Sequence, residues 1–144
     1  MPSGGCFCDA IRISYTGEPG AHLLCHCTDC RKITGATYSN NIVLPEGQFK
    51  LESVHHLTPP GKPKTISKKA DSGNQITSHF CGDCGTTLYR TGDSFPNQVI
   101  IKAGVLDDDN WPNENVPKGE LYVKERVKWL SKIPGAAQME GMPS

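Results

Sequence analysis

Seven cysteines in three short clusters constrain this chain more than any other feature of its sequence. The clusters are Cys6-Phe7-Cys8, Cys25-His26-Cys27-Thr28-Asp29-Cys30 and Cys81-Gly82-Asp83-Cys84. Cysteines one or two residues apart can turn their sulfur atoms onto a common tetrahedral ion, whereas loops this short rarely close as unstrained disulfides. The spacing therefore predicts metal binding, and such cysteine patterns are typical of zinc.

The number of cysteines suggests that one metal site is closed and the other open. Four thiolates close a structural zinc site, while three leave a coordination position for water or substrate, which is usual for catalytic zinc. The triplet Cys25, Cys27 and Cys30 can supply three ligands from one turn of chain. We therefore assign it to an open, catalytic site.

The two remaining pairs complete the partition. Cys6 with Cys8 and Cys81 with Cys84 together provide the four ligands of a structural site, which gives two zinc ions per chain. A competing partition joins the Cys27-x-x-Cys30 pair to Cys81 and Cys84 as an ordinary zinc ribbon. That alternative leaves three thiols without a metal.

Other interpretations explain the cysteines less well. A single cysteine is usually a small buried hydrophobe, but burial alone does not account for seven that are clustered. The odd count, the short loops and the lack of a signal peptide in Met1 to Gly5 oppose a disulfide framework. We expect reduced, metal-bound thiolates and a cytoplasmic protein.

The length of 144 residues suits one domain, and the 36% hydrophobic content with 15 glycines and 11 prolines predicts many turns around a thin core. We predict a single zinc domain over residues 1–133 and a C-terminal tail over residues 134–144. The tail has little to bury and is expected to be mobile; the alternative is a lid that folds back over the site. Structural zinc contributes on the order of 10 kcal/mol of binding free energy, so its removal should unfold the domain.

Charge and hydropathy argue against two classes of partner, nucleic acid and membranes. The chain carries 15 basic and 15 acidic side chains, and the basic ones form no long run beside aromatic residues, which disfavours nucleic acid. No apolar stretch approaches the roughly 20 residues of a membrane helix. The expected partner is a small-molecule substrate.

Short strands separated by glycine and proline predict an all-β domain. Ile11, Ile13 and Tyr15 alternate with polar residues, which is the period of a half-buried strand. A turn of helix is predicted over Cys27 to Ile33, and Cys81 to Gly85 is predicted to be a zinc knuckle between two strands of a hairpin. The other predicted strands are Ala21 to Leu24, Tyr38 to Leu44, Phe49 to Val54, Lys64 to Lys69, Gln75 to Phe80, Thr86 to Arg90, Val99 to Ala103 and Leu121 to Val127.

The open site is suited to thiols. The complex of zinc with three thiolates has a formal charge of minus one, so the zinc is a modest Lewis acid. It still binds sulfur well, and a thiol that coordinates to it is deprotonated. This predicts a thiol substrate such as glutathione. The candidate catalytic residues are Arg31 and Lys32, which can offset negative charge or hold a carboxylate, and His26, a candidate for proton transfer. The alternatives are a solvated basic pair and a histidine ring that points away from the ion.

The ordered motifs resemble a known family. They are Cys6-x-Cys8, Cys25-His26-Cys27-x-x-Cys30-Arg31-Lys32 with Gly35, Phe80-Cys81-x-x-Cys84-Gly85-Thr86, and Gly104-Val105-Leu106-Asp107-Asp108. Over Gly4 to Trp129 the chain resembles the glutathione-dependent formaldehyde-activating enzyme (GFA) family, also called the CENP-V or Mss4-like group.

The resemblance implies an Mss4-like β-tent of short antiparallel strands stapled by zinc, with the two metal sites partitioned as above. It also implies a carbon–sulfur lyase that joins glutathione to formaldehyde as S-hydroxymethylglutathione, or reverses that step. A larger aldehyde or another glutathione adduct would use the same zinc with different walls. Candidate wall residues are Tyr38, Asn40, Asn41, Phe95 and Trp111.

Two other functions are open at this point. The first is a zinc Lewis-acid enzyme that acts on a thiol-free metabolite. The second is a non-catalytic Mss4-like binding module, although the neutral charge disfavours a chromatin or microtubule role.

Overall fold

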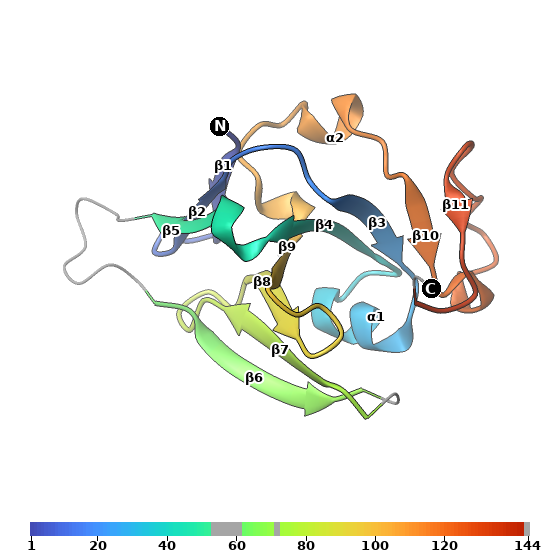
Figure 1. The fold of residues 1–144 in the computed structure, drawn as a ribbon, viewed down its shortest axis with the longest axis horizontal. Helices are drawn as coiled ribbons and strands as arrows, with labels where there is room; N and C mark the ends of the chain where they lie inside the picture. The colour runs from blue at the N-terminus through green and yellow to red at the C-terminus, as the bar shows by residue number, and fades with distance from the viewer. Residues whose placement is uncertain (53–61, 71–72, 143–144) are drawn as a thin grey trace.

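Two β-sheets hold most of the regular secondary structure in a computed structural model that describes residues 1–52, 62–70 and 73–142 (Figure 1). The helical elements are α1 (Thr28–Thr34), α2 (Trp111–Glu114) and the 3-10 turns η1 (Glu46–Gln48), η2 (Ala103–Val105) and η3 (Val123–Glu125). The strands are β1 (Ser3–Gly5), β2 (Arg12–Tyr15), β3 (Ala21–Cys25), β4 (Ser39–Pro45), β5 (Phe49–Glu52), β6 (Lys64–Lys69), β7 (Gln75–Phe80), β8 (Thr87–Gly92), β9 (Gln98–Lys102), β10 (Gly119–Leu121) and β11 (Ala137–Gln138). The chain is mostly β, as the sequence predicts.

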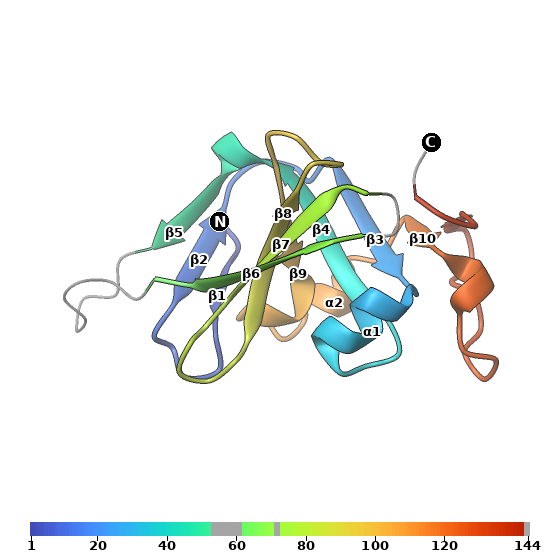
Figure 2. The same ribbon diagram turned by 90° about the horizontal axis from the view of Figure 1, so that it is seen from below.

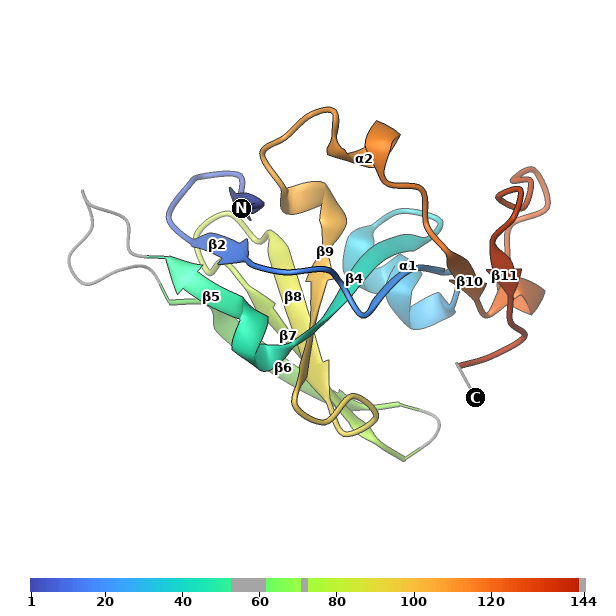
Figure 3. The same ribbon diagram turned by 45° about the horizontal axis from the view of Figure 1, so that its top comes forward.

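The strands pair in two sheets of unequal size. The small sheet has the antiparallel order β1-β2-β5, and the large one has the order β11-β10-β3-β4-β9-β8-β7-β6 (Figure 3). Most neighbours are antiparallel, but β10 runs parallel to both β3 and β11. The expectation of antiparallel strands is therefore wrong at this edge. A long crossover through the rest of the sheet separates β3 from β10, and only long connections allow parallel pairing.

The predicted strands agree with the structure except near the C-terminal end. Those at Lys64–Lys69 and Gln75–Phe80 match β6 and β7 at both ends. The strand predicted over Leu121 to Val127 is wrong, because β10 ends at Leu121 and the next residue, Tyr122, has a left-handed φ of 55°. Extended pairing cannot continue through such a residue, and the chain turns into η3. The last two residues of the strand predicted to end at Val54 lie outside the described residues.

The central strands β4 and β9 are buried on both faces, so their side chains alternate between two hydrophobic clusters. Cluster 1 includes Ile42, Leu44 and Ile101 and also contains Cys6 and Cys81. Cluster 2 contains the intervening residues Val43 of β4 and Ile100 of β9. Its other buried members are Leu23, Cys25, Cys30 and Leu121. The large sheet therefore separates the two groups of cysteines.

The helix α1 lies where β3 ends and β4 begins (Figure 2). Its N-cap is Cys27, whose sulfur accepts a hydrogen bond from the Cys30 amide at 3.3 Å. The helix stops at Gly35, which has a φ of 68° and donates its amide to the Arg31 carbonyl at 2.8 Å. Glycine reaches this left-handed conformation without steric cost, which ends the helix after seven residues.

The C-terminal segment, residues 133–142, contains β11 and runs beside β10 on the side away from β3 (Figure 1). Ala137 pairs with Gly119, and the Met139 amide donates to the Glu120 carbonyl at 2.9 Å. The Met139 side chain packs against cluster 2. In the described part of the chain, no helix is long and apolar enough to cross a membrane.

Replacing Ile42 with alanine should lower the free energy of unfolding by about 2–5 kcal/mol, because this fully buried side chain would leave a cavity in cluster 1. Urea denaturation of the metal-loaded protein measures the change. The matched control is Ile66→Ala on β6, where the side chain is 61% exposed and the expected change is below about 0.5 kcal/mol. Equal effects of the two substitutions would contradict this description of the core.

Candidate metal centres

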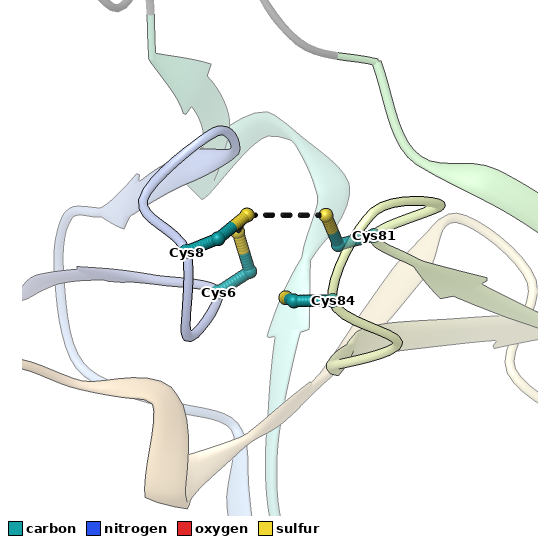
Figure 4. Close-up of side chains that lie close together, drawn as sticks. All are labelled: Cys6, Cys8, Cys81 and Cys84. Atoms are coloured by element: carbon teal, nitrogen blue, oxygen red, sulfur yellow. Dashed lines mark hydrogen bonds between the residues drawn. The ribbon is translucent and has the colours of Figure 1, made fainter.

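Four cysteine sulfurs from two turns meet beside cluster 1 (Figure 4). Cys6 and Cys8 come from the turn between β1 and β2, and Cys81 and Cys84 come from the turn between β7 and β8. All four sulfurs lie within 4.8 Å of one another; Cys8 is 3.6 Å from Cys6 and 3.7 Å from Cys81. Ligands at about 2.3 Å from one tetrahedral zinc lie about 3.8 Å apart, so this group fits a closed four-sulfur site.

Hydrogen bonds hold both turns of this group in place. The Ile11 amide donates to the Cys6 sulfur at 3.3 Å. The Thr86 hydroxyl lies 3.2 Å from the Cys84 sulfur and accepts the Phe7 amide at 3.1 Å, so it links the two turns. Hydrogen bonds from Thr86 lower the pKa of the Cys84 thiol to about 6, which favours the thiolate that a metal requires.

The other three cysteines meet at the end of β3, on the opposite side of the large sheet. The sulfurs of Cys25, Cys27 and Cys30 lie within 4.8 Å of one another, with Cys25 and Cys27 3.4 Å apart. Cys25 is the last residue of β3, Cys27 caps α1, and Cys30 lies in its first turn. The donor set fits a metal ion and provides three ligands, as the spacing predicts.

The three thiols perturb one another strongly. Hydrogen bonds from Cys25 and then Cys27 lower the pKa of Cys30, although burial raises it. The positive charge of Lys102 also lowers the pKa of Cys30. Hydrogen bonds with Cys27 and Cys30 raise the pKa of Cys25. The three thiols therefore titrate as one coupled group rather than as independent cysteines.

The structure places His26 in a buried polar network. Its ring is fully buried, and Nε2 lies 2.8 Å from the Glu120 carboxylate. The other carboxylate oxygen accepts hydrogen bonds from Arg126 at 3.1 Å, the Ile133 amide at 3.0 Å and the Gln138 amide group at 2.7 Å. One buried carboxylate thus connects the cysteine loop, residues 25–30, to the C-terminal segment.

Strand register explains why His26 and the cysteines lie on different sides. In the parallel pair of β3 and β10, Leu121 is opposite Cys25 and Glu120 is opposite Leu24. Alternation along the strands then puts Leu121 with Cys25 on the cluster 2 face and Glu120 on the other. His26 contacts that carboxylate, on the side away from the sulfurs.

Arg31 and Lys32 point to different surroundings. The Arg31 guanidinium donates to the backbone carbonyl of Glu125. Lys32 is exposed and lines a small cavity between α1 and residues of β6, β7 and β8. The larger cavity beside the three cysteines is not lined by Arg31, Lys32 or His26.

A cavity of about 320 Å³ opens beside the three cysteines. Its wall includes residues of α1, η3 and the central strands. Two of the five candidate wall residues, Asn41 and Phe95, line this cavity. The other three contact histidine rings outside it; they are Tyr38, Asn40 and Trp111. The apolar side chains around the cavity are Leu23, Val43, Ile76, Phe95, Ile100, Leu121 and Met142.

Sequence reasoning missed two cations on the cavity wall, Lys102 and Arg90. Lys102 ends the apolar run of β9 and is only 7% exposed; its ammonium donates to the Asn41 side chain at 2.6 Å. Burial lowers the pKa of Lys102, while the negative charge of Cys30 opposes that shift. The one sequence signal was a lysine inside a strand buried on both faces, where lysine is rare.

Comparison with known proteins identifies the family. Residues 1–125 match the model of the glutathione-dependent formaldehyde-activating enzyme family, so the chain belongs to this family, as its motifs suggested. A Rhodobacter sphaeroides protein of known crystal structure aligns with a TM-score of 0.56 and 16% identity over 78% of this chain and 94% of its own. That likeness concerns the fold alone. No curated protein matches the chain in sequence.

Replacing Glu120 with glutamine should lower the free energy of unfolding by about 2 kcal/mol or more at neutral pH, because buried donors lose their charged acceptor. Burial raises the pKa of Glu120, but the hydrogen bonds from Gln138, Ile133 and His26 outweigh it, so the pKa is lowered overall. A carboxylate with a lowered pKa stabilises the fold above its ordinary pKa and loses that effect in acid. The difference between wild type and variant should therefore shrink as the pH falls below about 4.5.

Denaturation at several pH values tests this prediction. The control is Glu46→Gln, at an exposed position in η1. A Glu120 variant as stable as this control at neutral pH would show that the buried network contributes nothing.

Proposed function

We propose that the protein is a zinc-dependent carbon–sulfur lyase that joins glutathione to an aldehyde, or releases the aldehyde from its glutathione adduct. Its fold would then be an Mss4-like β-tent stapled by two zinc ions. Family membership supports glutathione and formaldehyde as the reactants. The observation that carries the proposal is the meeting of three cysteine sulfurs beside a cavity large enough for a substrate.

The two cysteine groups would have different roles. Cys6, Cys8, Cys81 and Cys84 would hold a structural zinc, since four sulfurs leave no position for a substrate. Cys25, Cys27 and Cys30 would hold a catalytic zinc and leave one position for a substrate sulfur. Zinc bound there supplies a Lewis acid that keeps an incoming thiol deprotonated at neutral pH.

The bond changes are those of thiol addition to a carbonyl. The sulfur lone pair forms the new carbon–sulfur bond, the electron pair of the C=O double bond moves to oxygen, and that oxygen takes a proton. The reverse reaction returns the electron pair to sulfur and releases the aldehyde. The cavity wall contributes by holding both reactants together, which removes much of the entropic barrier.

For His26 and Arg31 we propose roles that differ from the predicted catalytic ones, because neither residue lines the cavity. His26 and Arg31 are proposed to be positioning residues, because each ties the cysteine loop to distant chain, through Glu120 and through the Glu125 carbonyl. Lys32 is proposed to offset negative charge from the cavity between α1 and strands β6 to β8. Proton transfer would then use water admitted to the cavity.

The apolar part of the cavity wall favours an aldehyde larger than formaldehyde. Formaldehyde is small compared with a cavity of about 320 Å³ that has apolar residues in its wall. Apolar walls stabilise apolar groups by removing their surface from water. A larger aldehyde is therefore included in the proposed substrate class.

Metal analysis of two cysteine variants tests the proposed sites. Wild type should contain two zinc ions, and Cys27→Ser should contain one and keep its fold. Cys84→Ser should lose a closed site that contributes on the order of 10 kcal/mol, and with it most of the stability of the domain. Zinc content and thermal melting measure both effects. Unfolding by Cys27→Ser, with a folded Cys84→Ser, would reverse the two assignments.

Exchange of labelled formaldehyde with its glutathione adduct tests the proposed reaction. Zinc-loaded wild type should accelerate this exchange, measured by NMR, and Cys27→Ser should not. Full activity on an aldehyde without glutathione would instead favour Lewis-acid chemistry on a thiol-free metabolite. Absence of glutathione binding, with a stoichiometric protein partner recovered, would favour a binding module.

A further inference from the structure

Two buried cations lie on the same face of the large sheet as the three cysteines. Arg90 of β8 is opposite Ile100 of β9, and Lys102 is two residues further along β9. Because side chains alternate along a strand, Arg90, Ile100 and Lys102 project toward one side, which is the cavity side. The exposed fractions of Lys102 and Arg90 are only 7% and 8%.

Neither cation has a carboxylate partner within the residues that the structure describes. The Lys102 ammonium donates to Asn41, and the Arg90 Nε donates to the Ser78 hydroxyl at 3.1 Å. These neutral groups satisfy hydrogen bonds without balancing charge. A buried, uncompensated charge is costly, and buried charges are usually paired, so these two cations call for a negative charge nearby.

The acidic residues around the cavity are engaged elsewhere. The Asp29 carboxylate lies 3.5 Å from the ammonium of Lys68. The Glu125 carboxylate accepts the Thr28 amide at 3.1 Å, at the start of α1. Both interactions occur at exposed positions rather than at the buried end of the cavity. The counter-charge for Lys102 and Arg90 must therefore come from the cysteine site and from what it binds.

Counting formal charges gives one missing negative charge. Three thiolates on a divalent ion carry minus one, and the two cations bring the buried site to plus one. A substrate thiolate would make it neutral. When the carbon–sulfur bond forms, the same single charge moves from sulfur to the aldehyde oxygen, and the site stays neutral.

From this balance we propose that Lys102 and Arg90 form an anion subsite, which holds the one negative charge that a thiol substrate brings as thiolate and then carries as an alkoxide oxygen. The inference rests on the proposed function and adds a role for residues behind the sulfur ligands. The ligand class is a thiolate or its aldehyde adduct. The subsite would act through fixed charges placed before the reaction, the form of electrostatic stabilisation that active sites use most.

Calorimetry with two ligands tests the subsite without measuring turnover. Glutathione binds as a thiolate, whereas S-methylglutathione carries the same two carboxylates but a neutral sulfur. For Lys102→Met, glutathione affinity should fall about ten-fold or more, since a hydrogen bond to a buried charge is lost. The affinity for S-methylglutathione should change by less than about two-fold. Lys102→Arg should retain most of the glutathione affinity.

Three further variants complete the experiment. Arg90→Met should show the same selective loss as Lys102→Met, and Arg90→Lys should restore it, which covers the case in which one methionine variant fails to fold. Lys50→Met is the matched control, because the Lys50 side chain is 72% exposed on the small sheet. Zinc content is measured for every variant, so that loss of metal is distinguished from loss of ligand affinity.

The outcomes separate the two proposals. If wild type does not bind glutathione, the proposed function fails. If wild type binds glutathione and both methionine variants bind it equally well, the function stands and the anion subsite is wrong. An equal loss for both ligands would mean that the cations bind a carboxylate of the tripeptide, which also overturns the subsite as stated.

Discussion

The alternation of side chains along the central strands β4 and β9 organises the rest of the molecule. Ile42 and Ile101 face cluster 1, while Val43 and Ile100 face cluster 2. Each cluster carries its own cysteine group, so the sheet itself keeps the two sets of sulfurs apart. A slip of one residue in this register would move both sets of side chains to the wrong face. The two candidate metal centres therefore depend on one pairing pattern.

A second constraint is the buried carboxylate of Glu120. It receives hydrogen bonds from the cysteine loop through His26 and from the C-terminal segment through Gln138. That segment also supplies Met142 to the cavity wall. The shape of the cavity and the geometry of the sulfurs are thus connected through one acceptor, although Glu120 itself lines no part of the cavity.

Local patterns in the sequence predicted the cysteine groups and most of the strands, because short spacing and period-two alternation are properties of adjacent residues. What could not be predicted depends on residues far apart in the chain. The wrong strand after Leu121 follows from the left-handed Tyr122, and the parallel pairing of β10 follows from the long crossover before it. Lys102 was missed because its neighbours in space, Asn41 and Cys30, come from other elements.

The same distinction separates what family membership says about metal from what it says about substrate. The candidate sulfur ligands come from three short motifs of neighbouring residues. The cavity wall instead combines single residues such as Leu23, Ile76, Phe95 and Met142, which belong to four separate segments. Any of them can change without disturbing a cysteine motif. A chain of this family can therefore keep both candidate metal centres while the wall adapts to a different substrate.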